Sequence, residues 1–302
     1  MLLHDCIKAF FAHHYATVNV STHTKKAYES DLRHFHLYAG AAVKPCDVDK
    51  EALRGYIRHM RDRCELKETT IKRRIACLKL FFRWATEEGM LSTNPFEHLG
   101  ERIRLPRRLP RSLGKDEIVR LKAIATKGMR TDDFQTLTNK IAIGLLIATG
   151  IRVGELVNIC LDDLDLVDGS IKIHGKGNRQ RIAYVLEPLL STSISRYLGM
   201  RESRAPDNPT LLVSVGGKPI TTDNLRQALR RTAKNAGIPR RITPHMLRHT
   251  AASRWLEAGL DIRYVQKLLG HHSIATTEIY THVTDNGLRR ALQQLVDRRT
   301  DN

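Results

Sequence analysis

Apolar residues recur at helical spacing through the first hundred residues of the chain. Across residues 24–38 they fall three and four positions apart, and the same pattern returns across residues 69–88. This spacing places apolar side chains on one stripe of an α-helix, which can then pack against a core. Gly89 follows the second stretch directly and is a plausible cap for its end. The pattern predicts a helical N-terminal domain over residues 1–100.

The character of the chain changes after residue 100. Residues 101–113 are rich in arginine and contain two prolines, which is typical of an extended linker between domains. Beyond it, residues 170–173 and 181–186 alternate or run apolar with β-branched residues, and residues 174–180 between them are rich in glycine. We therefore expect a β-hairpin within an otherwise helical second domain, residues 114–302.

Several helix boundaries in the second domain can also be predicted. Its first helix has Ser112 or Gly114 as the residue that caps its N-terminus. An apolar helix is expected over residues 138–149, and Gly150 breaks it. After Thr222 the pattern is helical to the end, including a last helix with an apolar stripe of Leu288, Ala291, Leu292, Leu295 and Val296.

The charge of the chain points to a polyanionic partner. It carries 50 Lys+Arg against 32 Asp+Glu, a formal net charge of +18, and a pI near 10.0. Such an excess favours nucleic acid first and an acidic membrane second, although a merely basic solvated surface is the alternative. The basic residues occur in both domains and in the linker, which suggests a clamp around a duplex.

The cysteines and the hydropathy of the chain indicate the cellular compartment in which the protein is expected. The five cysteines (Cys6, Cys46, Cys64, Cys77 and Cys160) are odd in number and never spaced as C-x-x-C, which argues against a disulfide framework or a cysteine zinc site. No signal pattern opens the chain and no apolar run approaches the length of a membrane span. We expect an intracellular, soluble protein without a membrane partner.

Polar residues in the second domain suggest phosphate chemistry when they are taken together. Two arginines can hold the oxygens of a phosphodiester and neutralise charge in its transition state. A tyrosine hydroxyl can attack phosphorus, while a lysine and a histidine transfer the protons. Taken alone, each such residue is more often a surface charge or a packing residue. The candidates, in chain order, are Arg152, Lys176, His245, Arg248, His271 and Tyr280.

These residues lie in blocks that resemble one known family. The blocks are Thr149-Gly-Ile-Arg-Val-Gly-Glu-Leu156, His174-Gly-Lys-Gly-Asn-Arg-Gln-Arg181, Thr243-Pro-His-Met-Leu-Arg-His-Thr250, Leu268-Leu-Gly-His271 and Thr276-Thr-Glu-Ile-Tyr-Thr-His282. Their order and spacing closely resemble the tyrosine recombinase, or phage integrase, family, with Xer-type and transposon or integron integrases the most similar. The resemblance covers roughly residues 140–285, and more loosely the N-terminal helices.

The resemblance implies roles for the candidate residues. The positions of Arg152 and Arg248 bind the scissile phosphate, and His271 hydrogen-bonds it. Lys176 is the general acid for the leaving 5′-oxygen and His245 an acid or base. Tyr280 attacks to give a 3′-phosphotyrosyl intermediate, without a metal or other cofactor. Glu155 supports the site, unless it is a simple surface charge.

The resemblance also implies an architecture and partners. We expect a mainly α fold with a small β-sheet, in which a helical, SAM-like core-binding domain and a mixed α/β catalytic domain form a C-shaped clamp. The partner is double-stranded DNA with specific core sites, bound by a homo-tetramer, with or without a second recombinase. Relatives donate the last helix to a neighbouring protomer, although it can also dock on its own domain. The expected location is the cytoplasm, on the nucleoid.

Six further cations are candidates for contact with the DNA backbone. They are Lys72, Arg73, Arg74 and Lys79 in the second predicted helix, and Arg107 and Arg108 in the linker. For the helix cations, a solvated surface is an equally good interpretation. Binding through many phosphates predicts an affinity that falls steeply with added salt.

Three other functions fit parts of this pattern. A type IB topoisomerase uses a similar set of residues but relaxes supercoils as a monomer. A DNA-bending accessory protein would have a dead site, whereas all six catalytic positions are filled here. A metalloenzyme built on His245 and His249 lacks the glutamate of H-E-x-x-H. The DNA sequence that is recognised, and the choice among chromosome dimer resolution, transposon resolution and integration, cannot be derived from the sequence.

Overall fold

The chain folds into two units, which are described separately. The computed structural model describes residues 1–97, 112–175, 179–271 and 273–278. The units divide between Arg107 and Arg108, within the segment expected to be a linker. The expected linker cations Arg107 and Arg108 lie outside the described residues. Across the described ranges, no helix is both long and apolar enough to cross a bilayer.

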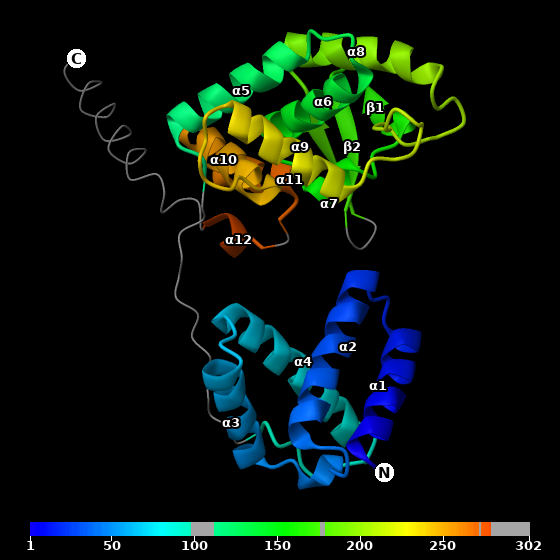
Figure 1. The fold of residues 1–302 in the computed structure, drawn as a ribbon, viewed down its shortest axis with the longest axis vertical. Coiled ribbons are helices and arrows are strands. Elements are labelled where there is room, and N and C mark those ends of the chain that lie inside the picture. The colour runs from blue at the N-terminus through cyan, green and yellow to red at the C-terminus, as the bar shows by residue number, and fades with distance from the viewer. Residues whose placement is uncertain (98–111, 176–178, 272, 279–302) are drawn as a thin grey trace, which may run out of the picture. The chain divides into compact units, whose positions relative to one another are not determined.

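The first unit is a bundle of helices (Figure 1). The two helices predicted over residues 24–38 and 69–88 are present, each beginning one or two residues earlier. Gly89 follows the second of them with a φ of 69°, the left-handed conformation that glycine adopts readily. The bounds are α1 Leu3–Thr17, α2 Thr22–Ala39, α3 Lys50–Arg58 and α4 Glu68–Glu87, with a short 3-10 turn at Pro45–Asp47 and a π-helical turn at His59–Arg63.

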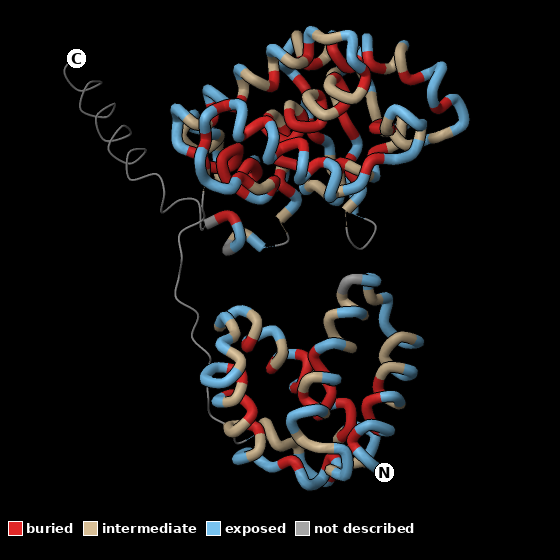
Figure 2. The backbone as a smooth tube through the Cα atoms, in the orientation of Figure 1, coloured by how far each residue is buried: buried red, intermediate tan, exposed pale blue. Residues whose placement is uncertain are grey.

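Aromatic packing forms the core of this unit. Phe81 and Phe82 on α4 are fully buried, and Phe10 of α1 packs edge-on against Phe81. Phe35 of α2 makes a similar edge contact with Phe82. Figure 2 shows the buried positions concentrated on the inward sides of the helices. The apolar stripes seen in the sequence are therefore the surfaces by which these helices pack together.

The second unit combines helices with a small sheet (Figure 1). Its elements are α5 Lys115–Gly128, α6 Phe134–Thr149, α7 Val153–Leu156, β1 Leu164–Asp165, β2 Ser170–His174, β3 Gln180–Tyr184, α8 Pro188–Glu202, α9 Thr222–Asn235, α10 Pro244–Glu257, α11 Ile262–Leu269 and α12 Ala275–Glu278. Gly114 is the cap of α5, one of the two residues predicted for that position. Leu113 is buried and donates its N–H to Thr250 Oγ1 at 2.8 Å, so it packs with this unit although the sequence assigned it to the linker.

The predicted hairpin is present as an antiparallel pair. β2 and β3 run antiparallel, with Ile173 opposite Arg181, and the sheet order is β1-β2-β3. β1 was not predicted because two residues are too short for an alternating pattern to show. The hairpin loop between His174 and Gln180 includes residues 176–178, which lie outside the described residues. Lys176 is among them.

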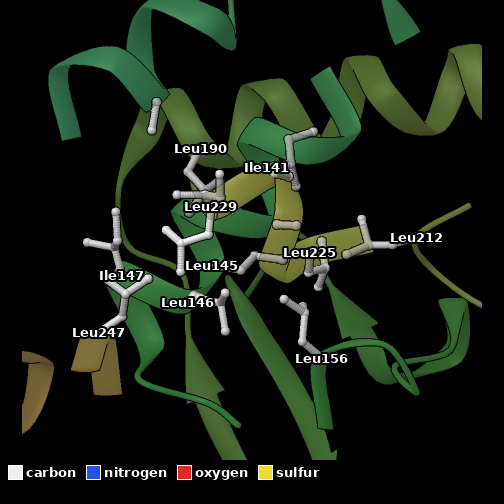
Figure 3. Close-up of a cluster of buried hydrophobic side chains, with 14 of the residues drawn as sticks. Ile141, Leu145, Leu146, Ile147, Leu156, Leu190, Leu212, Leu225, Leu229 and Leu247 are labelled. Atoms are coloured by element: carbon white, nitrogen blue, oxygen red, sulfur yellow. The ribbon is translucent and has the colours of Figure 1, made fainter. Parts of the chain in front are cut away.

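Helix α6 is the centre of the second core. It contacts α5, α8, α9 and α10, and most of its residues are buried. Figure 3 shows side chains of α6 surrounded by leucines from several other elements, namely Leu156, Leu190, Leu212, Leu225, Leu229 and Leu247. A helix that is apolar on all sides belongs at such a centre. Its C-terminal end is thereby fixed, and the first catalytic candidate follows it directly.

Candidate active site

Arg152 is positioned by a sharp break between two helices. Gly150 ends α6 with a φ of 59°, and Arg152 is the residue that begins α7. A side chain at Gly150 would bring a Cβ atom to 3.2 Å from both Ala251 and Leu269. Glycine is thus required here by conformation and by space. The break leaves the Arg152 side chain about half exposed, in an open groove on the surface of the unit.

Glu155 binds two arginines. Its carboxylate accepts from Arg152 Nη1 at 2.8 Å and from the backbone N–H of Arg152 at 2.9 Å. Arg181 of β3 donates to both oxygens of the same carboxylate, at 3.1 and 2.7 Å. Burial opposes ionisation of Glu155, but these donors outweigh it and lower the pKa of the carboxyl group. The carboxylate of Glu155 thus joins Arg152 to β3, and its supporting role in the site remains a prediction.

Arg248 is held between two helix ends. It lies on α10, whose first turn is capped by Thr243, and its side chain is almost completely buried. Nη1 donates to the carbonyl oxygen of Gly150 at 2.9 Å, and Nη2 donates to that of Leu269 at 2.5 Å. These carbonyls belong to the last turns of α6 and α11, where helices carry partial negative charge. With 2% of the residue exposed, direct contact with a phosphate requires a local shift around Arg248.

His271 follows the end of α11. Gly270 ends that helix with a φ of 65°, and the backbone N–H of His271 donates to Gln266 at 3.1 Å. The ring atom Nδ1 lies 2.9 Å from the hydroxyl of Thr277 on α12. Burial first, and then the positive charges of Arg248 and Arg152, lower the pKa of His271 to about 4. The ring is consequently neutral at pH 7.

His245 and His249 lie one turn apart on α10. Their rings contact edge to face, with centroids 4.3 Å apart. Burial, followed by the charges of Arg248 and Arg152, lowers the pKa of His245. Burial and the neighbouring His245 lower the pKa of His249 to about 4. His245 is therefore neutral at pH 7, the form that can accept a proton.

The structure brings four of the six catalytic candidates together. Arg152 and His271 line one groove with Glu155 and Arg181. The charge of Arg248 lowers the pKa of His271, and the charges of Arg248 and Arg152 lower that of His245, so both residues lie near this group. The groove extends to the base of the hairpin at Gly175 and Arg179. Lys176 and Tyr280 lie outside the described residues, so their roles remain predictions.

Three contributors were not identified from the sequence: Arg181, Gln266 and Thr277. A signal existed for Arg181, because it alternates with Ala183 and Val185, both buried, on one face of β3. The other face of that strand is also apolar, so the sequence did not show which side is inward. No sequence pattern marked the contacts of Gln266 or Thr277 with His271, because these depend on how the chain turns after α11.

The cations of α4 differ in their surroundings. Lys72 and Lys79 are exposed, and the Lys79 ammonium lies 5.6 Å from the centre of the Phe96 ring. Arg73 is about half exposed and pairs with Asp31. Arg74 is mostly buried, with Nε 3.5 Å from the same carboxylate. The position of Arg74 suits an internal ion pair better than a phosphate contact, whereas Lys72, Arg73 and Lys79 remain candidates for DNA contact.

Comparison with known proteins gives the family of the chain. Residues 111–287 match the model of the phage integrase family, and residues 7–89 match the phage integrase N-terminal SAM-like domain. The chain belongs to the phage integrase family. The first match includes every segment that carries a catalytic candidate, and the second covers most of the helical unit.

Individual relatives of this family are named tyrosine recombinases. The chain is 35% identical over 269 residues to tyrosine recombinase XerC of Thermodesulfovibrio yellowstonii, a match that covers 87% of this chain and 86% of the relative. It is 32% identical to tyrosine recombinase XerD of Halalkalibacterium halodurans, with coverage of 89% and 90%. The fold is similar to that of the XerH site-specific recombinase in a post-cleavage complex with its difH substrate, with a TM-score of 0.76, 23% identity and coverage of 88% and 78%.

Proposed function

We propose that this phage integrase family member cleaves and rejoins DNA at specific sites through a covalent bond between Tyr280 and a 3′-phosphate. The Tyr280 oxygen forms a bond to phosphorus while the bond from phosphorus to the 5′-oxygen breaks. The freed 5′-hydroxyl of a partner strand then attacks the phosphotyrosyl ester and releases the tyrosine. The number of phosphodiester bonds is unchanged, so the exchange requires no nucleotide as an energy source.

The observation that carries this proposal is the positive electrostatic environment around His271. Arg152, Arg181 and Arg248 all contribute to lowering the pKa of this histidine, after burial itself. Three guanidinium groups near one groove favour an anion, and the half-exposed fork of Arg152 suits the oxygens of a phosphate. Such preorganised positive charge stabilises the additional negative charge of a pentavalent phosphorus transition state.

The protonation states fit the proposed roles of the two histidines. Neutral His245 can take the proton from Tyr280 as the tyrosine attacks. When Thr277 donates its hydroxyl to Nδ1 of His271, the ring proton lies on Nε2, where it can be donated to a phosphate oxygen. Arg152 is the exposed arginine that contacts the phosphate directly, and Lys176 on the hairpin protonates the leaving 5′-oxygen.

We infer the partners from the family and from the charge. The partner is double-stranded DNA with a specific core site, contacted by both basic units, and four copies act on two sites, with or without a second recombinase. The last predicted helix, beyond the described residues, serves exchange between neighbouring copies. The reaction takes place on the nucleoid, in the cytoplasm. Integration, excision and resolution of DNA elements are the roles that this chemistry serves.

A suicide substrate tests the central step. The substrate is a nicked duplex that carries the terminal or junction sequences of the surrounding DNA element. After cleavage, the short fragment with the freed 5′-hydroxyl dissociates, so the strand cannot be rejoined and the covalent complex is trapped. We expect an SDS-resistant adduct with the parent chain that also forms in EDTA, and none with Tyr280→Phe. Tyr264→Phe is the matched control, because Tyr264 is an exposed tyrosine beside the same groove.

Three outcomes would contradict the proposal. An adduct that persists in Tyr280→Phe would assign the nucleophile to another residue. An adduct that is lost with Tyr264→Phe but kept with Tyr280→Phe would identify Tyr264 instead. A chain that relaxes supercoiled circles as a monomer, without producing recombinants, would indicate a topoisomerase.

A further inference from the structure

Arg181 links three parts of the candidate site. Its Nη1 and Nη2 atoms donate to the two carboxylate oxygens of Glu155, and its Nε donates to the carbonyl oxygen of Leu268 at 2.9 Å. Only about a tenth of each charged side chain in this pair is exposed. Glu155 also holds the backbone and the guanidinium of Arg152. A continuous chain of hydrogen bonds thus runs from Arg152 to the last turn of α11.

The end of α11 depends on this contact. The carbonyl of Leu268 is bound by Arg181 and that of the next residue, Leu269, by Arg248. Both carbonyls lie in the last turn of the helix, where backbone acceptors have no partner within the helix. Gly270 follows, and a Cβ atom there would lie 3.0 Å from Cδ of Arg181 and 3.2 Å from its Nε. The arginine therefore packs directly against the residue that precedes His271.

We propose that Arg181 is a positioning residue of the recombination site, which holds His271 in register with Arg152 by joining β3, Glu155 and the end of α11. The proposal rests on the proposed function, because the role assigned to His271 is contact with the scissile phosphate. Arg181 acts through Glu155 and the α11 carbonyl, since each of its three nitrogen atoms already donates to one of these two partners. Arg181 lies in β3, so the same contact ties this strand to the end of α11.

A simple stabilising ion pair is the alternative, and the chain contains a matched example. Arg240 binds both carboxylate oxygens of Glu117, with Nε at 2.8 Å from Oε1, and donates to the carbonyl of Ser112 at 2.8 Å. The chemistry of the two arginines is the same: one bidentate carboxylate and one backbone carbonyl. Arg240 is not among the residues that line the groove of Arg152 and His271. Its side chain is more exposed than that of Arg181, 41% against 10%, so its removal reports the loss of a bidentate pair of the same chemistry away from the groove.

The experiment compares Arg181→Ala, Arg181→Lys and Arg240→Ala in the full chain. Single-turnover cleavage of the nicked duplex at saturating DNA is measured together with the Kd for DNA. We expect Arg181→Ala to cleave about 100-fold more slowly with unchanged Kd, because a small displacement of a catalytic group has effects of this size. Arg240→Ala should cleave like the parent chain. Arg181→Lys should recover little, because one ammonium cannot bind two carboxylate oxygens and a carbonyl in one plane.

Hydrogen exchange of the free protein provides a measurement that does not depend on activity. Arg181→Ala and Arg181→Lys should raise amide exchange across residues 262–271, whereas Arg240→Ala should raise it only near Ser112 and Glu117. If Arg181→Ala fails to fold, the lysine variant decides with the same two measurements. The proposal is overturned if Arg181 variants cleave as fast as Arg240→Ala, if Arg181→Lys restores the full rate, or if exchange across residues 262–271 is unchanged. Failure of the parent chain to form any adduct would instead contradict the proposed function, and exchange would still test the positioning.

Discussion

The guanidinium of Arg248 donates a hydrogen bond to the carbonyl oxygen of Gly150, 98 residues earlier in the chain. Gly150 caps the end of α6, two residues before Arg152. Arg248 therefore fixes the backbone that positions Arg152. The bond depends on the left-handed conformation of Gly150, which directs its carbonyl toward α10. The site is thus assembled by contacts between helix ends.

Replacement of Gly150 by alanine should destabilise the chain and slow cleavage. The left-handed conformation costs a residue with a Cβ atom roughly 1–2 kcal/mol. Close contacts at 3.2 Å with Ala251 and Leu269 add to this cost. Urea denaturation of Gly150→Ala should show the lower midpoint. Gly199→Ala is the control, since it lies within helix α8 with nothing within 4 Å of a Cβ atom, and it should be neutral or stabilising. Equal stability of the two variants would contradict the structural role of Gly150.

The free energy of unfolding should fall as the pH drops from about 6.5 toward 4. The pKa of His249 and of His271 is lowered from 6.5 to about 4 in the folded chain. Well above pH 6.5 both rings are neutral whether the chain is folded or unfolded, so they contribute no pH dependence there. Between these values the unfolded chain binds protons that the folded chain excludes, which costs up to about 1.4 kcal/mol per pH unit for each ring.

Urea unfolding across this pH range measures the effect. His249→Gln should reduce the slope of the free energy of unfolding against pH by the contribution of one titrating ring. This holds whatever the effect of the substitution on stability at neutral pH. The lowered pKa of Glu155 does not interfere in most of the range, because its ordinary value is 4.5 and its stabilisation is lost only as the pH falls below that. Parallel curves for the parent chain and His249→Gln would show that His249 is not held neutral by the fold.

Asp31→Asn should destabilise the N-terminal unit. Asp31 is buried on α2 and pairs with Arg73 and the mostly buried Arg74 of α4. Removing one partner of a buried ion pair leaves the other charge uncompensated, at a cost of about 3 kcal/mol. Glu51→Gln is the control, because Glu51 pairs with Arg54 on the surface and exposed pairs contribute little. Thermal unfolding that is as insensitive to Asp31→Asn as to Glu51→Gln would contradict this prediction.

Lys72 and Arg74, two residues apart on α4, should respond differently to alanine substitution. Lys72 is exposed, and a phosphate contact by it contributes about one to the slope of log affinity against log salt concentration. Lys72→Ala should lower this slope, measured from about 50 to about 200 mM salt, and leave thermal stability unchanged. Arg74→Ala should lower stability, with no change in slope for a chain that remains folded. An unchanged slope with Lys72→Ala would remove Lys72 from the DNA interface.

Several elements were predictable because their signal is local. The apolar spacing on α2 and α4 marked helices whose bounds differ by only one or two residues from those observed. The hairpin of β2 and β3 followed from β-branched strands around a glycine-rich turn. Gly150 was recognisable as a helix end because glycine readily adopts the left-handed conformation found there. Gly114 was one of two candidates for the N-cap of α5, ahead of the acidic residues of its first turn. The sequence placed Arg74 with the other α4 cations as a candidate for DNA contact. It could not show that Arg74 is mostly buried, because its ion-pair partner Asp31 lies more than forty residues away in the chain.

The α2 and α4 helices, the hairpin and the set of residues that identifies the family were predictable from the sequence, since these depend on neighbours in the chain or on residue types in a fixed order. Only the tertiary structure showed that Arg181 and Arg248 bind successive carbonyls at the end of α11, and that Glu155 joins Arg152 to β3. Backbone carbonyls are the same at every position and leave no mark in a sequence. The low pKa of His271 likewise arises from burial and from arginines on three separate elements. Their distances from the ring exist only once the chain has folded.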